Sequence, residues 1–99
     1  KKPDPDQFNV LRKIQNNPNA TQRKLASDLE MSLGKLNYCL RALRAKGLIK
    51  MSNFAKNKNK LNYIYLLTPK GISEKAKLTM NFMKLKMKEY EELKKEIEK

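Results

Sequence analysis

Five polar or basic side chains in one short segment have the types and spacing needed to contact another molecule. They are Lys35, Asn37, Tyr38, Arg41 and Arg44. On a helix they fall outside the stripe formed by the apolar residues of the same segment, so they point mostly outward. A face of Lys, Asn, Tyr and Arg without an acid has the groups that contact base edges and phosphates in a DNA major groove.

Two short helices joined by a tight turn are predicted to position this face, within residues 21–50. Thr21 is a candidate N-cap of the first helix, since its hydroxyl can accept a hydrogen bond from a free amide of the first turn. Ser32 is a candidate N-cap of the second helix. The apolar residues of the second helix recur at i, i+3, i+4 and i+7 and are Leu36, Cys39, Leu40 and Leu43. Gly47 suits the end of this helix because glycine tolerates a positive φ.

The charge distribution favours a polyanionic partner. The 99-residue chain carries 23 Lys and Arg against 10 Asp and Glu, a net charge of +13. No acidic residue occurs between Glu30 and Glu74. The alternative is a solvated basic surface with no such partner, but folded surfaces usually mix charges of both signs. An acid-free interval over sequence with folded character is typical of a protein that binds nucleic acid.

The composition argues against catalysis and metal binding. Histidine is absent and Cys39 is the single cysteine, so the chain lacks a zinc or haem ligand set and a Cys–His pair. We therefore expect no enzyme, no catalytic residue, no metal and no cofactor. Cys39 lies on the apolar stripe, where a small core residue is favoured over a redox thiol. No apolar run reaches the roughly 20 residues of a membrane span and no signal peptide is visible, so we expect no membrane partner and a cytoplasmic, nucleoid-associated protein.

A helix precedes this segment and a β-hairpin follows it. The helix is predicted from Asp6, a candidate cap, to the Asn-Pro cluster near Pro18, with Phe8, Leu11 and Ile14 on one face. The hairpin is predicted over residues 48–68, with strands at 48–55 and 61–68. Its tip, residues 56–60, is the basic sequence Lys56, Asn57, Lys58, Asn59 and Lys60. Crowded lysines repel one another, and a phosphate backbone would relieve that repulsion.

One long helix is predicted over residues 69–99, with Thr68 as N-cap and Pro69 as first residue. Its apolar positions recur in steps of four and three, in the manner of a heptad repeat. They are Ile72, Ala76, Met80, Met83, Met87 and Tyr90. So long a helix exceeds what a small domain can cover, so this row of residues is expected to form a homodimer interface. Its methionines favour a dimer contact over a ligand cleft.

The order helix, helix-turn-helix and basic hairpin is that of a winged helix-turn-helix domain, in which the hairpin is the wing. The strings SLGKLNYCL and YLLTPKGI, at residues 32–40 and 65–72, also resemble the MarR-type winged-helix regulators. They are most similar to the small branch associated with exopolysaccharide (EPS) gene clusters. The resemblance covers about Gln7 to Glu92.

This resemblance implies a bacterial transcriptional regulator that binds double-stranded DNA as a homodimer. By position, Ser32 would cap the recognition helix and the wing tip would carry the lysines of residues 56–60. The DNA-facing residues would be Leu33, Gly34, Lys35, Asn37, Tyr38 and Arg41, with Arg44 as a further basic candidate from the residues themselves. Asn37 can pair with adenine or be a solvated helix residue, and Arg41 can reach phosphate or a base. Larger MarR proteins have a longer N-terminal helical segment than the twenty residues before Thr21, which puts a small-molecule effector in doubt.

The expected fold class is mainly α with a small β-hairpin (α+β), a winged helix-turn-helix fold. Residues 1–68 are expected to form the DNA-binding domain, and residues 69–99 are expected to form a long C-terminal dimerisation helix. Two other function classes stay open. An RNA- or ribosome-binding module would need exposed stacking aromatics, for which Tyr63 and Tyr65 on one face of the hairpin are candidates. A protein–protein adaptor acting through the long helix would leave the acid-free interval unexplained.

Overall fold

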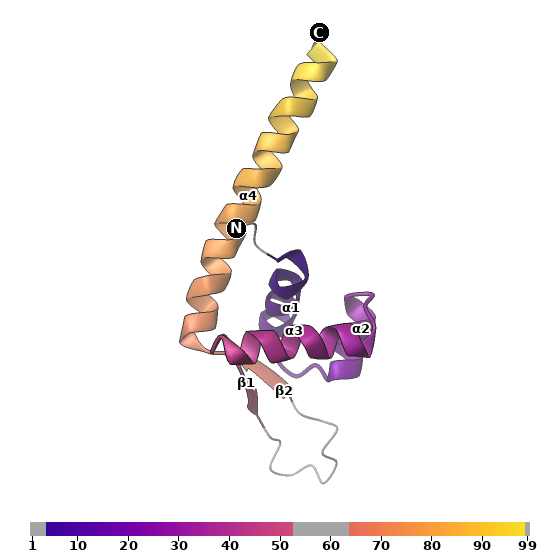
Figure 1. The fold of residues 1–99 in the computed structure, drawn as a ribbon, viewed down its shortest axis with the longest axis vertical. Helices are drawn as coiled ribbons and strands as arrows, with labels where there is room; N and C mark the ends of the chain where they lie inside the picture. The colour runs from indigo at the N-terminus through magenta and orange to yellow at the C-terminus, as the bar shows by residue number, and fades with distance from the viewer. Residues whose placement is uncertain (1–3, 53–63, 99) are drawn as a thin grey trace.

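The computed structural model describes residues 4–52 and 64–98 of the chain (Figure 1). In chain order the elements are α1 (Pro5–Asn16), α2 (Gln22–Asp28), α3 (Leu33–Ala45), β1 (Ile49–Ser52), β2 (Ile64–Leu67) and α4 (Pro69–Glu98). The first three helices and the base of the hairpin pack together, and α4 leaves this domain as a long arm (Figure 1). The molecule measures 63 × 26 × 21 Å as a result. The predicted fold class, a mainly α winged helix with a two-stranded antiparallel hairpin, is confirmed.

Capping residues fix where the helices begin. The Thr21 hydroxyl accepts a hydrogen bond from the Lys24 amide (3.2 Å), and the Ser32 hydroxyl accepts one from the Lys35 amide (3.0 Å), so both predicted caps are confirmed. For α1 the predicted cap, Asp6, is wrong. Asp4 is the cap, and its carboxylate accepts from the amides of Asp6 (2.9 Å) and Gln7 (3.3 Å). The helix begins earlier because Pro5 lacks an amide hydrogen and fits the first helical position.

The domain core is built around the apolar stripe of α3. Its four residues Leu36, Cys39, Leu40 and Leu43 are all buried, as predicted. They pack in one cluster with residues of α1, α2 and the hairpin, namely Val10, Leu11, Ile14, Leu25, Ala26, Leu48, Ile49 and Tyr65. Burying a side chain of this size contributes about 1.5–3 kcal/mol. This stripe therefore fixes the rotation of α3 and decides which of its side chains face outward.

The two strands of the hairpin pair in antiparallel fashion, with Ile49 opposite Leu67 and Ser52 opposite Ile64. The far parts of the predicted strands and the wing tip at 56–60 lie outside the described residues. Tyr65 is buried, and its hydroxyl accepts a hydrogen bond from Nε2 of Gln22 (2.7 Å). Tyr65 is therefore a core residue and is unavailable for stacking on a base. Tyr63, the other candidate, lies outside the described residues.

A short junction joins the domain to α4. The Thr68 hydroxyl accepts a hydrogen bond from the Gly71 amide (3.0 Å), which confirms Thr68 as the cap, and it donates one to the Gly47 carbonyl (2.6 Å). Gly47 has a φ of +74°, the left-handed conformation predicted for it. Gly71 is buried against Leu48, and a Cβ at Gly71 would lie 1.9 Å from the Leu48 carbonyl oxygen. Only a residue without a side chain fits here, so Gly71 sets how closely α4 begins against the domain.

The first part of α4 rests on α1. Leu78 packs against the core cluster, and the ring of Phe82 stacks on the ring of Phe8 with centroids 4.6 Å apart. From Met83 to Glu98 every residue of the helix is exposed. The predicted single long helix is confirmed, and about half of it does not pack against the domain.

Candidate nucleic-acid interface

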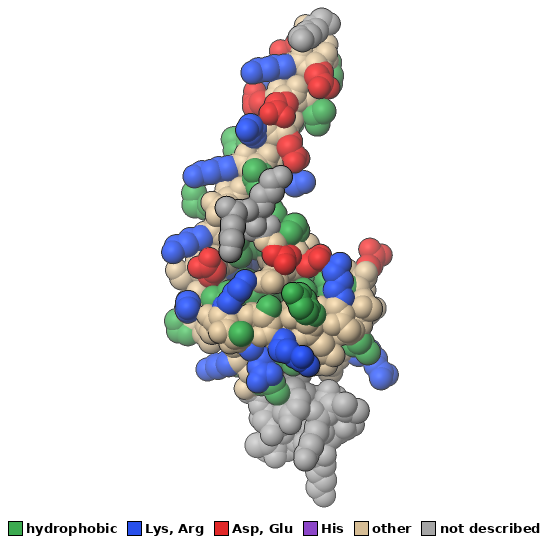
Figure 2. All heavy atoms as spheres, in the orientation of Figure 1, with side chains coloured by type: hydrophobic (Ala, Val, Ile, Leu, Met, Phe, Trp, Pro, Cys, Tyr) green, Lys and Arg blue, Asp and Glu red, His purple; other side chains and the backbone are tan. Residues whose placement is uncertain are grey.

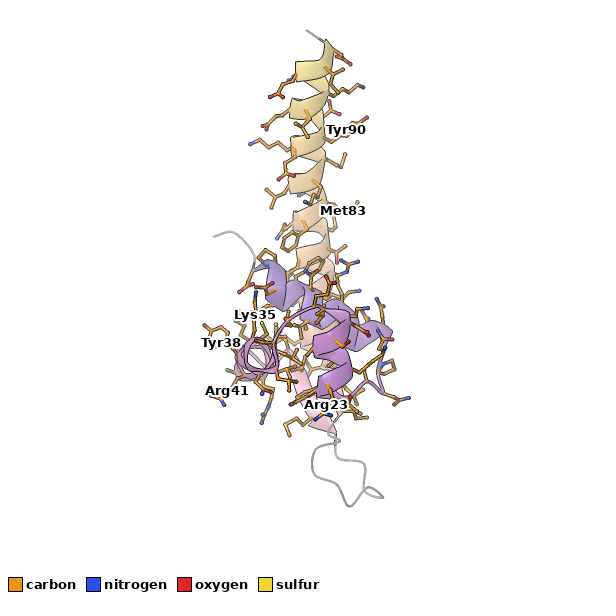
Figure 3. The ribbon with its side chains drawn as sticks, turned by 90° about the vertical axis from the view of Figure 1, so that its right-hand side faces the viewer. Arg23, Lys35, Tyr38, Arg41, Met83 and Tyr90 are labelled. Atoms are coloured by element: carbon orange, nitrogen blue, oxygen red, sulfur yellow. The ribbon has the colours of Figure 1, made fainter. Side chains whose placement is uncertain are left out.

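The outward side of α3 is an exposed surface that contains no acidic residue. Tyr38 is 71% exposed and Leu33 45% exposed. Every other residue proposed from the sequence for this helix is also exposed, namely Ser32, Gly34, Lys35, Asn37, Arg41 and Arg44. Figure 3 shows Tyr38 and Arg41 on the side of α3 that faces away from the domain and from α4. A helix held by a buried stripe thus presents a polar, basic side to solvent.

These exposed residues divide into three directions around the helix. At 100° per residue, Gly34, Tyr38 and Arg41 lie opposite the buried stripe and form the outer face. Leu33, Asn37 and Arg44 lie on one flank. Lys35 lies on the other flank, toward α1. Tyr38 therefore lies between Lys35 and Arg41, about 60° around the helix from each, whereas Lys35 and Arg41 are about 120° apart.

Lys35 has an ionic partner within the protein. Its Nζ lies 3.1 Å from Oδ2 of Asp6, in the first turn of α1. The two side chains are 53% and 44% exposed, so water and salt screen the attraction and the pair is worth little, of the order of 0–1 kcal/mol. A phosphate can therefore compete with Asp6 for Lys35 at small cost.

The turn between α2 and α3 contains a residue in an unusual conformation. Glu30 has a φ of +53°, and the amide of the next residue, Met31, donates to the Ala26 carbonyl (3.0 Å). A left-handed residue at this point reverses the chain and satisfies the end of α2. For a residue with a side chain this conformation costs of the order of 1–2 kcal/mol. Sequence reasoning did not identify Glu30, because glycine or asparagine is the usual signal for such a turn.

Sequence reasoning also did not single out Arg23. It is exposed on α2, two residues after the Thr21 cap, and Figure 3 shows it on the part of the domain nearest the hairpin. The first turn of α2 has no acidic residue. In helix-turn-helix proteins the helix before the recognition helix crosses the DNA backbone. A basic residue just after an N-cap was the available signal.

The buried thiol of Cys39 is shielded from reaction. Cys39 is 3% exposed, and burial, with the nearby carboxylates of Asp4 and Asp6, raises the pKa of the thiol above its ordinary value. A raised pKa leaves little thiolate near neutral pH, so the site favours a packing role. Within residues 4–52 and 64–98 no cluster of three or more His, Cys, Asp or Glu side chains could hold a metal ion. The helices in that same part of the chain are each too short or too polar to cross a bilayer.

The six apolar residues predicted for dimerisation form an exposed row on α4, which we call the seam. Ile72 is 50% exposed and Met87 is 63% exposed, and Met80, Met83 and Tyr90 fall between these values. Ala76 is exposed as well. Figure 3 shows Met83 and Tyr90 on the part of α4 that projects past the domain. The seam lies on a different side of α4 from Phe82, which stacks on α1, although Met83 and Met87 also line the groove between the two helices.

A groove of about 830 Å³ lies between α1 and α4. The aromatic rings of Phe8 and Phe82 form part of its wall, with the guanidinium of Arg12 5.5 Å from the centre of the Phe8 ring. The remaining lining combines charged side chains such as Lys86 and Glu89 with apolar ones such as Met87. The expectation that a small-molecule effector is doubtful stays a prediction.

Comparison with known proteins agrees with this geometry. Residues 7–50 match the family model described as winged helix-turn-helix DNA-binding. No curated protein sequence matches the chain.

Three solved structures share the fold. The Staphylococcus aureus regulator MarR, in complex with salicylate and kanamycin, has a TM-score of 0.72 and 22% identity, over 88% of this chain and 57% of that one. The PcaV regulator of Streptomyces coelicolor, in complex with its natural ligand, has a TM-score of 0.77 and 15% identity, over 87% and 60%. FabT of Streptococcus pneumoniae, in complex with DNA, has a TM-score of 0.69 and 21% identity, over 93% and 62%. The chain thus matches about three fifths of the length of these regulators.

Fold and family match together define a winged helix-turn-helix protein. Its fold is that of the MarR-family transcription regulators, so the resemblance inferred from residues 32–40 and 65–72 is confirmed at the level of the fold. The EPS-associated branch stays a prediction.

Proposed function

We propose that this chain is a sequence-specific, duplex-DNA-binding transcription regulator that acts as a homodimer. The observation that carries the proposal is the exposed, acid-free outer face of α3, held by a buried stripe in a winged-helix domain. The face has the side-chain chemistry of a recognition helix, and an α-helix is an element that the major groove admits. The net charge of +13 supplies the attraction to phosphate.

The similar structures support DNA as the partner. FabT was solved in complex with DNA, and so was MepR of S. aureus, which shares the fold at a TM-score of 0.69. RNA with unpaired bases is a weaker candidate, because Tyr65, one of the two possible stacking residues of the hairpin, is buried. The resemblance to EPS-associated regulators extends the proposal to control of exopolysaccharide genes in a bacterial cytoplasm.

Different residues are proposed to recognise the bases and to bind the DNA backbone. Asn37 reads a base, since an amide can bond an adenine in two places. Arg41 and Arg23 contact phosphates, and Tyr38 packs against the sugar–phosphate backbone. Lys35 also contacts a phosphate, after its ion pair with Asp6 breaks. The basic wing tip at residues 56–60 reaches the adjacent backbone or minor groove.

The homodimer is proposed to form through the seam of α4. An isolated domain of this size reads few base pairs, and two copies on a two-fold related site supply the missing specificity. Residues 1–68 would then be the DNA-binding unit and residues 69–99 the dimerisation unit. An exposed row of Met, Ile and Tyr side chains over several helical turns can bury the roughly 800 Å² per partner of a stable interface.

Two substitutions on α3 test the proposal by separating base recognition from phosphate binding. Asn37→Ala should reduce discrimination between a selected operator and random DNA by about 1–3 kcal/mol, and barely change binding to random DNA. Arg41→Ala should weaken binding to both and lower the slope of log K against log salt by about one per contact. Fluorescence anisotropy at several salt concentrations measures these quantities.

Lys95→Ala on the far part of α4 is the matched control, since it removes one positive charge from an exposed residue outside the interface. It should leave discrimination unchanged. If Asn37→Ala weakened specific and random binding by the same factor, Asn37 would not be a reader. If the wild type bound duplex RNA as well as it bound DNA, the assignment to DNA would be wrong.

A further inference from the structure

A column of charged residues runs along α4 beside the seam. Its members are spaced seven residues apart and are all exposed: Lys70, Lys77, Lys84, Glu91 and Glu98. Four of them directly follow an apolar position of the heptad pattern, namely Ala76, Met83, Tyr90 and Ile97. Seven residues are close to two helical turns, so the column stays on one side of the seam along the helix. Any copy that packs on the seam must pass beside this column.

The column changes sign along the helix, and so does α4 as a whole. Residues 69–88 contain six lysines and one glutamate, whereas residues 89–98 contain five glutamates and two lysines. On the face drawn in Figure 2, the acidic side chains gather on the C-terminal part of α4. A parallel pair would place the two basic halves together and the two acidic halves together. An antiparallel pair places each basic half against an acidic one, and charges beside an apolar seam set the orientation of paired helices.

Side-chain geometry gives the same answer in more detail. In antiparallel pairs, the position that follows Ala76, Met83 and Tyr90 in the heptad meets the same position of the partner helix. With the helices centred near Leu85, Lys77 then meets Glu91 of the other copy and Lys70 meets Glu98, each of them twice by symmetry. Lys84 meets its own symmetry mate, and so does Lys86 on the other side of the seam, so two like-charge contacts stand beside the four attractive ones. In parallel pairs each residue of the column instead faces the residue five positions earlier on the partner helix. The attractive contact that results is between Glu91 and Lys86.

Lys94 supplies an independent argument. It occupies the next apolar position of the heptad pattern after Tyr90 and is exposed. A parallel pair would bring two Lys94 side chains side by side in the seam, where two like charges repel at close range. In the antiparallel pair Lys94 lies opposite Ala76. The small alanine leaves room for the lysine stem to lie along the seam and for its ammonium group to reach water.

We propose that two copies of this chain pair antiparallel through the seam of α4, with Lys94 of each copy opposite Ala76 of the other. This inference rests on the homodimer of the proposed function and adds its orientation. It places the two winged-helix domains at opposite ends of the paired helices. The two Ile72 residues, near the start of each α4, are then about 40 Å apart at 1.5 Å per residue, close to one turn of B-DNA.

Crosslinking of single-cysteine variants tests the orientation. In a Cys39→Ala background, Ala76→Cys and Lys94→Cys proteins are each treated with a short bismaleimide, alone and after mixing to exchange subunits. The antiparallel pair predicts no crosslinked dimer in either unmixed sample, because like positions are about 27 Å apart. The mixed sample should form crosslinked dimers. Crosslinking within an unmixed sample, or its absence from the mixed one, would overturn the proposal.

A charge swap provides a second measurement. Glu91→Lys should weaken the dimer about tenfold in sedimentation equilibrium, because two attractive contacts become repulsive. Adding Lys77→Glu should restore the wild-type affinity, since each glutamate then meets a lysine again. In a parallel dimer Lys77 does not face residue 91, so no restoration would occur. Wild-type protein that stays monomeric at tens of micromolar would refute the homodimer itself, an outcome distinct from a dimer of the wrong orientation.

Discussion

The helices α3 and α4 have the same kind of apolar periodicity and opposite environments. The apolar stripe of α3 is at most 3% exposed, whereas the large apolar residues of the α4 seam are 50–63% exposed. In α3 the neighbouring elements cover the apolar side, and the polar side is left for a ligand. In α4 the domain covers one side as far as Phe82, and the apolar seam is left uncovered. An amphipathic pattern therefore marks a surface to be buried, and helix length relative to the domain decides whether the same chain can bury it.

The largest difference between the two helices should appear in stability. Leu36→Ala should lower the free energy of unfolding by about 2–5 kcal/mol, since Leu36 is fully buried and its truncation leaves a cavity. Met83→Ala should change it by less than about 0.5 kcal/mol when measured at concentrations too low for dimers, because Met83 is exposed in the single chain. Urea unfolding monitored by circular dichroism gives both values. Equal losses would show that α4 is part of the domain core.

Two glycines sharpen the same comparison at a smaller scale. Gly71→Ala should destabilise the fold by about 1–3 kcal/mol, because the added Cβ would overlap the Leu48 carbonyl oxygen and push α4 away from the domain. Gly34→Ala is the matched control in α3. Its added Cβ meets its nearest neighbour, the Ser32 hydroxyl, at 4.0 Å, so the higher helix propensity of alanine should stabilise the protein by up to about 1 kcal/mol. Thermal unfolding of both variants without DNA measures the difference, and a stabilised Gly71→Ala protein would refute the close contact at the junction.

The smallest expected effect concerns the boundary between α1 and α3. Asp6→Asn removes the carboxylate that pairs with Lys35 and should raise DNA affinity several-fold, because Lys35 no longer exchanges one partner for another. Stability should fall by less than about 1 kcal/mol, since Asp6 also lies favourably in the first turn of α1. Glu96→Gln, far along α4, changes the net charge equally. An equal rise in affinity for both variants would assign the effect to net charge instead of Lys35.

Much of the fold could be predicted because local signals and burial agreed. Caps such as Thr21 and Ser32 precede apolar stripes of the right period, and the change from period 3.6 to strand-like sequence after Gly47 located the hairpin. Features that depend on contacts distant in the sequence could not be predicted. Nothing local pairs Lys35 with Asp6 or places Gly71 against the Leu48 carbonyl. The Asp4 cap did have a local signal, the Pro5 that follows it, and the prediction of Asp6 overlooked that signal.

The junction at the start of α4 determines the direction in which this long helix projects from the domain. The Thr68 hydroxyl bridges Gly47 and Gly71, so the end of α3, the hairpin and the beginning of α4 are tied within a few residues. A rigid helix of 30 residues fixed at one end converts rotation into displacement. A tilt of about 10° at this junction moves the far end of a helix about 45 Å long by about 8 Å. That displacement exceeds the spacing of two base pairs, so in the proposed homodimer any molecule that changed the angle between α4 and the domain would change the operator spacing that fits.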